Sequence, residues 1–226
     1  MKLLALDTSG PWCSVALHDE GEIHERRIHC PQGHSEWVLV LIQALLSEAG
    51  LALAALDGLA FGCGPGSFTG LRIAAGVIQG LGLALEVPIA PVSTLAALAL
   101  QGFDRCPAVW ALPALDARMG EVYWAAYQRD ADGFPVPLIP EQVSPLDAIL
   151  VPEGSAGVKI GSGWGKPLST SSRWQGLAGD VLADAECWAR DVATLGVAML
   201  LKGKGVAPDQ ALPLYLRNRV TTPPSR

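Results

Sequence analysis

The sequence has few of the residues on which small extracellular folds and metal-bound folds depend. Its five cysteines are scattered, odd in number and form no C-x-x-C pair: Cys13, Cys30, Cys63, Cys106 and Cys187. This spacing argues against a disulfide framework and against a cysteine zinc site, and it is typical of a reducing compartment. We therefore predict a cytoplasmic protein.

Long uninterrupted apolar runs are also missing. The start MKLLALDTSG reaches Asp7 after four apolar residues, which is too short for the apolar region of a signal peptide. The uncharged run between Arg72 and Glu86 contains three glycines and is soon followed by two prolines. We expect it to fall short of a membrane span and predict no membrane contact.

Charge is scarce and biased toward acid. Only 17% of the residues are charged, and the net charge is −6. Such a chain does not attract nucleic acid through bulk electrostatics, so any contact with nucleic acid would be local or made by a partner. The one small basic cluster is Arg217, Arg219 and Arg226, which we interpret as a solvated terminus. Half of the chain is hydrophobic, which is ample for a buried core.

The order of patterns predicts an α/β fold with an internal repeat. The first part reads strand, Asp7, turn, strand, turn, strand, and then a helix that Ser35 would cap and Gly50 would end. The pattern restarts at residues 109–134, where Pro113 to Asp116 matches Leu4 to Asp7 and the turn DADG matches DEGE. We expect two related units, residues 1–103 and residues 104–226, with the boundary near residues 101–107.

The remaining elements are expected at the following places. Strands or extended segments are predicted at 56–64, 87–93, 135–145, 158–164 and 212–218, and helices at 69–85, 93–101, from 144 to 150, and once or twice within 182–203.

The glycine-rich stretch FGCGPGSFTGLR, residues 61–72, fits none of the common phosphate or nucleophile motifs. A dinucleotide fingerprint would need a third glycine where Ser67 or Thr69 stands, and a P-loop would need lysine where Leu71 stands. A hydrolase elbow around Ser67 would need glycines in place of Pro65 and Thr69. The remaining pattern of strand, glycine loop and helix is compatible with an anion site or with a tight turn that lets the helix pack closely.

Other candidate chemistry is limited. Asp7 is followed by Thr8 and Ser9, so it could orient a metal-bound water or a phosphate, but we favour an Asx-turn that closes a hairpin, and more so for Asp116. His34 begins the first helix, but its i+4 position is Val38, so no helical metal pair exists and we predict no metal site. No Cys–His or Ser–His–Asp arrangement can be inferred.

The two N-terminal helices are unusually apolar. Residues 37–46 are apolar at every position except Gln43, and the second helix contains Gly76-x-x-x-Gly80. A helix on one sheet needs only an apolar stripe. The first helix is therefore either fully buried or covered by a partner.

Five segments together resemble the bacterial TsaB (YeaZ) family, from end to end and in order: LALDTSGPWCSVAL, FGCGPGSFTGLRIAAGVIQGLGLA, PVSTLAALA, LDARMGEVYWAAYQ and LPLYLRN. The pair G-P-G-S-F-T-G-x-R and D-A-R-x-G-E-V-Y is the specific part. The resemblance implies a duplicated actin-like ATPase (ASKHA, ribonuclease H-like) fold with two lobes of mixed sheet and flanking helices. It also implies a part in making threonylcarbamoyladenosine on the adenosine 3′ of the anticodon in tRNA.

In that family the catalytic paralogue TsaD transfers the threonylcarbamoyl group, and the ATPase TsaE completes the assembly. TsaD carries an H-x-x-x-H metal pair, which is broken here at His34 and Val38, and GSGW at 161–164 is the nearest remnant of a second nucleotide loop. The resemblance therefore implies a non-catalytic scaffold. We assign it no cofactor of its own, while the complex uses ATP and tRNA is reached indirectly. The phosphate-type loop is then inherited and mainly structural, with these residues: Asp7, Thr8, Gly64, Gly66, Ser67, Thr69, Gly70 and Arg72.

The resemblance further implies a helical surface that pairs with TsaD, or with a second copy when the chain is alone. We expect a four-helix contact with contributions from Trp37, Leu41, Leu45, Ile73, Val77 and Gly80. A charge at Leu41 or Val77 should abolish the complex. The alternatives are a small kinase or ATPase that uses Asp7 and the glycine loop, a weak nucleotide site shared with the partner, and a metallopeptidase, which the missing histidine argues against.

Overall fold

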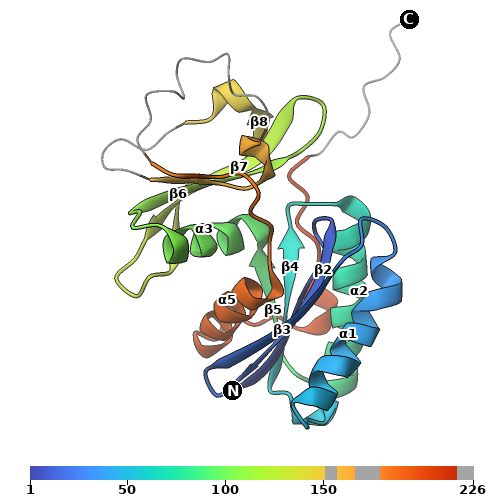
Figure 1. Ribbon diagram of the computed structural model, residues 1–226. Helices are drawn as coiled ribbons and strands as arrows, with labels where there is room; N and C mark the ends of the chain where they lie inside the picture. The colour runs from blue at the N-terminus through green and yellow to red at the C-terminus, as the bar shows by residue number, and fades with distance from the viewer. Residues whose placement is uncertain (151–156, 166–178, 218–226) are drawn as a thin grey trace, which may run out of the picture.

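A computed structural model describes residues 1–150, 157–165 and 179–217. The chain forms two lobes, and each lobe is built around a five-stranded mixed sheet (Figure 1).

The first sheet contains five strands of the N-terminal half. They are β1 (Lys2–Asp7), β2 (Trp12–Asp19), β3 (Glu22–His29), β4 (Gly58–Gly64) and β5 (Ile89–Ser93), in the order β3-β2-β1-β4-β5. β1 pairs antiparallel with β2, and β2 pairs antiparallel with β3. β4 is parallel to both β1 and β5.

The second sheet repeats this arrangement. Its strands are β6 (Trp110–Asp116), β7 (Glu121–Arg129), β8 (Pro135–Pro145), β9 (Val158–Ile160) and β10 (Val181–Leu182), in the order β10-β9-β6-β7-β8. The strand directions also match, because β6–β7–β8 are antiparallel and β6–β9–β10 are parallel. The duplication predicted from Asp7 and Asp116 is thus confirmed by topology.

Alternate side chains of the first sheet face two different layers. Leu4 and Leu6 join a core with α1 (His34–Glu48) and α2 (Phe68–Leu85). Leu3 and Ala5 join a core with α5 (Ala189–Leu201) on the other face. Figure 1 shows α1 and α2 on one side of this sheet and α5 on the other. This arrangement arises because successive side chains of a strand point to opposite faces of the sheet.

α3 (Thr94–Arg105) connects the two lobes. The Oγ of Ser93 caps this helix by accepting hydrogen bonds from the amides of Leu95 and Ala96, each at 3.1 Å. Leu95 and Phe103 of α3 pack with residues of the second sheet, and the helix also contacts β4, β5 and α5, so it lies between the two sheets (Figure 1). Four short 3-10 turns complete the described elements: η1 (Leu53–Ala55), η2 (Leu146–Ala148), η3 (Ser162–Trp164) and η4 (Pro208–Gln210).

The C-terminal part of the chain returns to the first lobe, which corrects the expected division at residue 104. α5 packs against β1, β2, β4 and β5. Further along, Val206 pairs with Ile89, and the amide of Leu214 donates to the carbonyl of Cys63 at 2.7 Å. Residues 189–214 therefore belong in space with the first sheet. Arg219 and Arg226 lie outside the described residues.

Three local expectations were wrong. Ser35 does not cap α1, because the helix already begins at His34 and Gly33 occupies the cap position with φ of 90°. The helix expected from residue 144 is only the turn η2. The helical stretch expected at 182–203 is shorter, since Val181 and Leu182 form β10 and helical structure begins at Ala189.

α2 covers the helix expected at 69–85 with one further residue, and its four glycines do not interrupt it. With 18 residues it is long and apolar enough to cross a membrane by length and composition, contrary to our expectation. A single helix of this kind is weak evidence for a span, because core helices pass the same test. Leu71, Ala74 and Ile78 of α2 are buried against the first sheet.

Candidate functional site

Asp7 lies at the carboxyl end of β1 and is almost fully buried, with 1% of its surface exposed. Its Oδ1 accepts hydrogen bonds from the amide of Ser9 at 3.1 Å and from the Ser9 hydroxyl at 2.9 Å. This is the Asx-turn that we favoured from the sequence. Oδ2 is also buried and has no hydrogen-bond partner among the described residues.

This environment makes the charged form of Asp7 unfavourable. Burial raises the pKa of Asp7 from its ordinary value of 3.8 to about 7. Hydrogen bonds from the amide and hydroxyl of Ser9 oppose the rise, and the negative charge of Glu186 adds to it. A carboxyl in this position is therefore partly protonated near neutral pH.

The turn after Asp7 and the glycine loop are in direct backbone contact. The amide of Ser67 donates to the carbonyl of Ser9 at 2.7 Å, and the Thr8 hydroxyl donates to the carbonyl of Gly70 at 2.8 Å. A Cβ on Gly70 would lie 1.8 Å from the Thr8 carbonyl oxygen. A Cβ on Gly66 would lie 2.7 Å from the Ser9 carbonyl oxygen. These glycines are required because the two turns are packed without space for side chains.

The start of the loop is covered as well. Gly64 has φ of +116°, and a Cβ there would lie 2.9 Å from the carbonyl oxygen of Leu214. The Thr94 hydroxyl donates to the carbonyl of Pro65 at 2.5 Å. Ser67 caps α2, because its Oγ accepts from the amide of Gly70 at 3.4 Å. Thr69 lies within the first turn of the helix that Ser67 caps.

The equivalent place in the second lobe is closed in the same way. A Cβ on Gly161 would lie 2.5 Å from the carbonyl oxygen of Ala114, and a Cβ on Gly163 would lie 2.9 Å from the Cβ of Ala114. The Oδ1 of Asp116 accepts from the amide of Arg118 at 2.7 Å, again an Asx-turn. Ser162 accepts from the amide of Asp116 at 3.2 Å. In both lobes, the contacts are those of a tight turn packed onto a strand end.

The predicted loop residues therefore separate into two groups. Asp7, Thr8, Gly66, Ser67 and Gly70 come together in the packed turns, and Gly64 lies beneath the C-terminal segment.

Thr69 and Arg72 lie on the exposed first turns of α2. The guanidinium of Arg72 stacks on Phe68, with its Cζ 3.5 Å from the ring centre. Arg72 therefore interacts with an exposed aromatic side chain.

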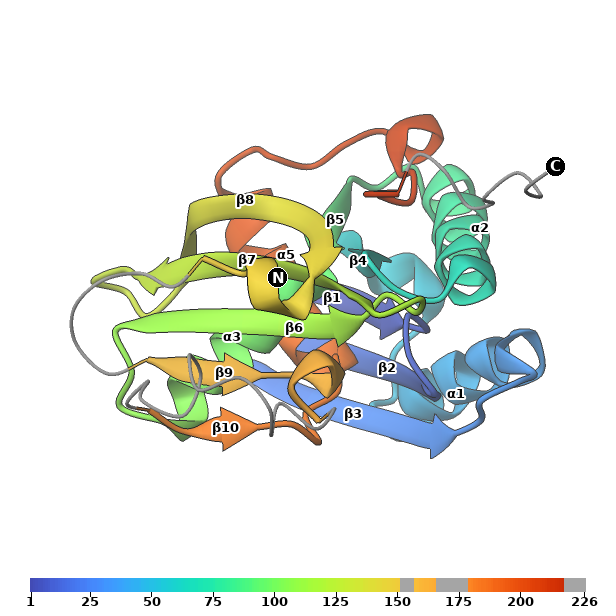
Figure 2. The ribbon, with the colours of Figure 1, turned by 90° about the horizontal axis from the view of Figure 1, so that it is seen from above.

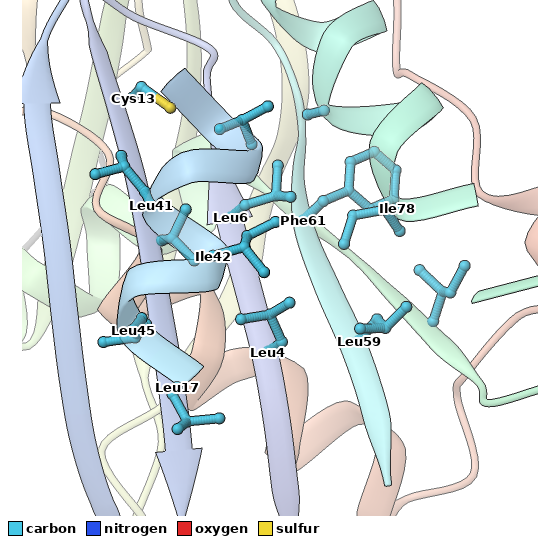
Figure 3. Close-up of a cluster of buried hydrophobic side chains, with 14 of the residues drawn as sticks. Leu4, Leu6, Cys13, Leu17, Leu41, Ile42, Leu45, Leu59, Phe61 and Ile78 are labelled. Atoms are coloured by element: carbon cyan, nitrogen blue, oxygen red, sulfur yellow. The ribbon is translucent and has the colours of Figure 1, made fainter. Parts of the chain in front are cut away.

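The predicted partner surface needs a correction. Leu41 and Leu45 are only 9% and 2% exposed, and Figure 3 shows them on α1 among the buried side chains that face the sheet. They are core residues and cannot form the outer surface of the helix. The outward-facing apolar residues of α1 are Trp37, Leu39 and Val40, which are 39%, 56% and 52% exposed.

α2, which contacts α1, has an apolar outer face on which two glycines leave the backbone uncovered. Ile73 and Val77 are partly buried and pack on the first core, while Leu83 is exposed. A Cβ on Gly76 or on Gly80 would meet nothing within 4 Å. Packing among the described residues therefore does not require glycine at either position. We define the pairing face as Trp37, Val40, Ile73, Gly76, Val77 and Gly80.

One pair of groups was missed from the sequence. The Sγ of Cys30 lies 3.2 Å from the Nδ1 of His34, and both residues are buried. Burial lowers the pKa of His34. The pair lies at the start of α1, where β3 has just ended, and no residue-type motif marks it. In the part of the chain that the structure describes, no group of three His, Cys, Asp or Glu residues could hold a metal ion.

The duplicated topology, with a packed turn at each lobe's first strand end, defines a two-lobed α/β protein built from two related units. The chain is 38% identical to the TsaB protein of Escherichia coli, over 97% of this chain and 96% of the relative, and 35% identical to that of Haemophilus influenzae, over 98% and 95%. The solved structure described as YeaZ from Pseudomonas aeruginosa is 41% identical, with a TM-score of 0.89 over 95% of this chain and 99% of its own. The chain belongs to the TsaB (YeaZ) family.

Two further findings complete the comparison. The family model described as "TsaD: tRNA N6-adenosine threonylcarbamoyltransferase" matches residues 28–170. The relatives in E. coli and H. influenzae are both named tRNA threonylcarbamoyladenosine biosynthesis proteins. A second P. aeruginosa structure, 41% identical with a TM-score of 0.89 over 96% of this chain and 99% of its own, is described as similar to peptidase YeaZ.

Proposed function

We propose that this chain is a non-catalytic subunit for making threonylcarbamoyladenosine in tRNA, in the cytoplasm. It pairs with the paralogous transferase TsaD, and the ATPase TsaE joins the assembly. The names of the relatives support the pathway, and the match to the TsaD-type family model supports common descent with the transferase.

The observation that carries the pairing role is the pairing face. Trp37 and Val40 expose apolar surface on α1, and on the neighbouring helix α2 a Cβ at Gly76 or Gly80 would meet no atom of the described residues within 4 Å. Small residues four apart on an exposed helix allow a second helix to approach closely. Two helices with an apolar outer face and few protruding side chains are suited to a four-helix contact with the matching helices of a homologous protein.

The packed turns support the non-catalytic role. The first-lobe turn is filled by backbone contacts between Thr8 and Gly70, and the second-lobe turn by contacts between Gly161 and Ala114. The groups near Asp7 include a second carboxyl, Glu186, whose charge disfavours a nearby anion. We therefore propose that this chain needs no cofactor and that the complex as a whole consumes the ATP.

When the partner is missing, the same surface would be left in contact with water. We propose that the isolated chain covers it by forming a homodimer with two-fold symmetry, which competes with pairing to TsaD. The two associations should therefore exclude each other. Adding TsaD to the isolated chain should replace the homodimer with a heterodimer.

The rival function is a nucleotide-dependent enzyme that uses Asp7. A buried carboxyl at a strand end with a pKa raised to about 7 is the observation in its favour, because perturbed carboxyls cluster at active sites. The two functions differ in what this chain does alone, which a reconstituted reaction can separate.

The test is threonylcarbamoyl transfer to tRNA in a reconstituted system. It contains the threonylcarbamoyl-adenylate synthase, TsaD, TsaE, ATP and tRNA, with and without this chain. A parallel reaction contains this chain and ATP alone. We expect transfer to require this chain and the chain alone to hydrolyse no ATP. Full transfer without the chain, or sustained ATP hydrolysis by the chain alone, would contradict the proposal.

A further inference from the structure

Phe68, Arg72 and Tyr215 form a stacked group at the start of α2. The Cζ of Arg72 lies 3.5 Å from the ring centre of Phe68 and 5.7 Å from that of Tyr215. The two ring centres are 5.6 Å apart, with an angle of 41° between the planes. Phe68 and Tyr215 remain 52% and 43% exposed. The group therefore presents aromatic surface and a guanidinium to solvent.

The group extends toward the second lobe through the C-terminal segment, which passes beside α2 (Figure 2). Two residues after Tyr215, Arg217 pairs with Glu121 at the start of β7. Its Nη1 also lies 3.7 Å from the Sδ of Met119, an exposed residue of the β6–β7 turn. We define the stacking patch as Phe68, Arg72, Met119 and Tyr215.

The local charge favours an anion although the whole chain is acidic. Within the described residues, Arg72 forms no ion pair with a carboxylate. The side chain of Arg118, next to Met119, is 87% exposed, and its Nη1 lies 3.9 Å from the Oδ2 of Asp116. Phe68 is also the first residue of an 18-residue helix, whose N-terminal end carries a partial positive charge.

We propose that the stacking patch binds an unpaired segment of RNA. Single-stranded nucleic acids are bound by aromatic rings on which bases stack and by cations that contact the backbone. Phe68 and Tyr215 provide the rings, and Arg72 provides the cation between them. The inference rests on the proposed function, because a tRNA whose modified base lies beside the anticodon presents an unpaired loop to the complex.

The aromatic rings of the patch lie beside the beginning of α2, whereas the pairing face starts at Ile73, next to Arg72, and continues along the middle of the helix. Gly80 follows Phe68 by 12 residues, and at a rise of 1.5 Å per residue the two are about 18 Å apart. A subunit can thus pair with its partner through the middle of the helix and contact RNA at its beginning. We therefore expect that substitutions of the aromatic rings change RNA binding and that substitutions in the pairing face change pairing with TsaD.

The test measures binding of a fluorescent RNA hairpin with an unpaired loop, by anisotropy, to the full chain at low salt. A blunt RNA duplex of equal length is the comparison ligand. The variants are Phe68→Ala, Tyr215→Ala and Arg72→Gln, and Trp37→Ala is the control because it removes an exposed aromatic ring from the pairing face. Thermal unfolding checks that each variant is folded. Pairing with TsaD is measured on the same samples by size-exclusion chromatography.

We expect each ring deletion to weaken hairpin binding at least fivefold, the lower end of what a lost base stack costs. Arg72→Gln should also reduce the salt dependence of binding, with a slope change of about 0.7. Trp37→Ala should leave hairpin binding unchanged and weaken pairing, while the ring deletions should leave pairing unchanged.

Three results would overturn the inference. One is equal binding of the hairpin by the wild type and both ring variants. Another is equal affinity for hairpin and duplex. The third is loss of pairing in the ring variants with RNA binding intact, which would make the patch a protein contact. The reconstituted transfer reaction separates this failure from failure of the proposed function, because transfer can depend on the chain whether or not the patch binds RNA.

Discussion

The substitution Asp7→Asn separates a structural role of Asp7 from a catalytic one. Asn has nearly the same shape and keeps the oxygen that accepts from the amide and hydroxyl of Ser9. It removes the negative charge from a fully buried site. We expect a protein whose stability depends less on pH and whose activity in the reconstituted transfer reaction is close to that of the wild type.

The magnitude follows from the raised pKa. A value of about 7 against an ordinary 3.8 corresponds to roughly 4 kcal/mol disfavouring the charged form in the folded state, at about 1.4 kcal/mol per pH unit. The folded protein binds this proton more tightly than the unfolded chain does. The resulting stabilisation is complete below pH 3.8 and is lost as the pH rises through about 7.

The amide of Asn has a cost of its own. Its NH2 group would replace Oδ2, which has no hydrogen-bond partner among the described residues, so a buried donor is left unsatisfied at about 1–3 kcal/mol. This cost does not vary with pH. We therefore expect the variant to be less stable than the wild type at pH 4 and more stable at pH 8, with the difference changing by roughly 3–4 kcal/mol across that range.

The assay is urea unfolding of both proteins at pH 4, 5, 6, 7 and 8. Asp191→Asn is a matched control, because burial also raises the pKa of Asp191 to about 7 and this residue lies on α5, outside the glycine loop. It should shift stability in the same direction. A difference between Asp7→Asn and wild type that stays constant with pH would refute the electrostatic reasoning. Loss of transfer by a folded Asp7→Asn protein would refute the structural role.

The remaining predictions concern matched pairs of substitutions. Gly70→Ala should destabilise the protein by more than about 3 kcal/mol in urea unfolding, because the added Cβ would lie 1.8 Å from a backbone oxygen of the neighbouring turn. Gly76→Ala should instead stabilise it by up to about 1 kcal/mol, because the Cβ meets nothing within 4 Å and alanine favours a helix. Equal changes in unfolding free energy for Gly70→Ala and Gly76→Ala would contradict the close packing of the glycine loop. Leu41→Asp should unfold the chain, because it places a charge in the core. The neighbouring Val40→Asp should leave thermal stability almost unchanged, but it should weaken pairing at least tenfold in a titration with TsaD. A stable Leu41→Asp protein would contradict the orientation of α1.

Sequence patterns predicted the features that repeat or that depend on local spacing. The duplication was visible because Asp7 and Asp116 each end a strand before a turn and a second strand, and the structure places them in equivalent sheets. The Asx-turn at each aspartate was also visible, since the hydrogen bond spans only two residues. The dense glycines indicated a tight loop, although spacing alone left an anion site equally open.

Other features depend on contacts that no local pattern encodes. Residues 37–46 are apolar almost throughout, so their sequence has no stripe that separates buried Leu41 and Leu45 from exposed Trp37 and Val40. The return of α5 to the first sheet depends on shape matching at Gly196, where an added Cβ would lie 2.6 Å from the Cβ of Ala60. Stacking of Phe68 and Arg72 with Tyr215 joins residues that are far apart in the sequence.

The most direct test of the account is to measure pairing with TsaD for Gly80→Arg. The structure leaves open space around Gly80, and arginine favours a helix more than glycine does, so the isolated variant should fold with an unfolding temperature equal to or above that of the wild type. Leu201→Arg, at an exposed position of α5 on the other side of the sheet, is the control. We predict that Gly80→Arg fails to bind TsaD and fails to support transfer, whereas Leu201→Arg binds TsaD and supports transfer. A folded Gly80→Arg protein that binds TsaD as tightly as the wild type would contradict it.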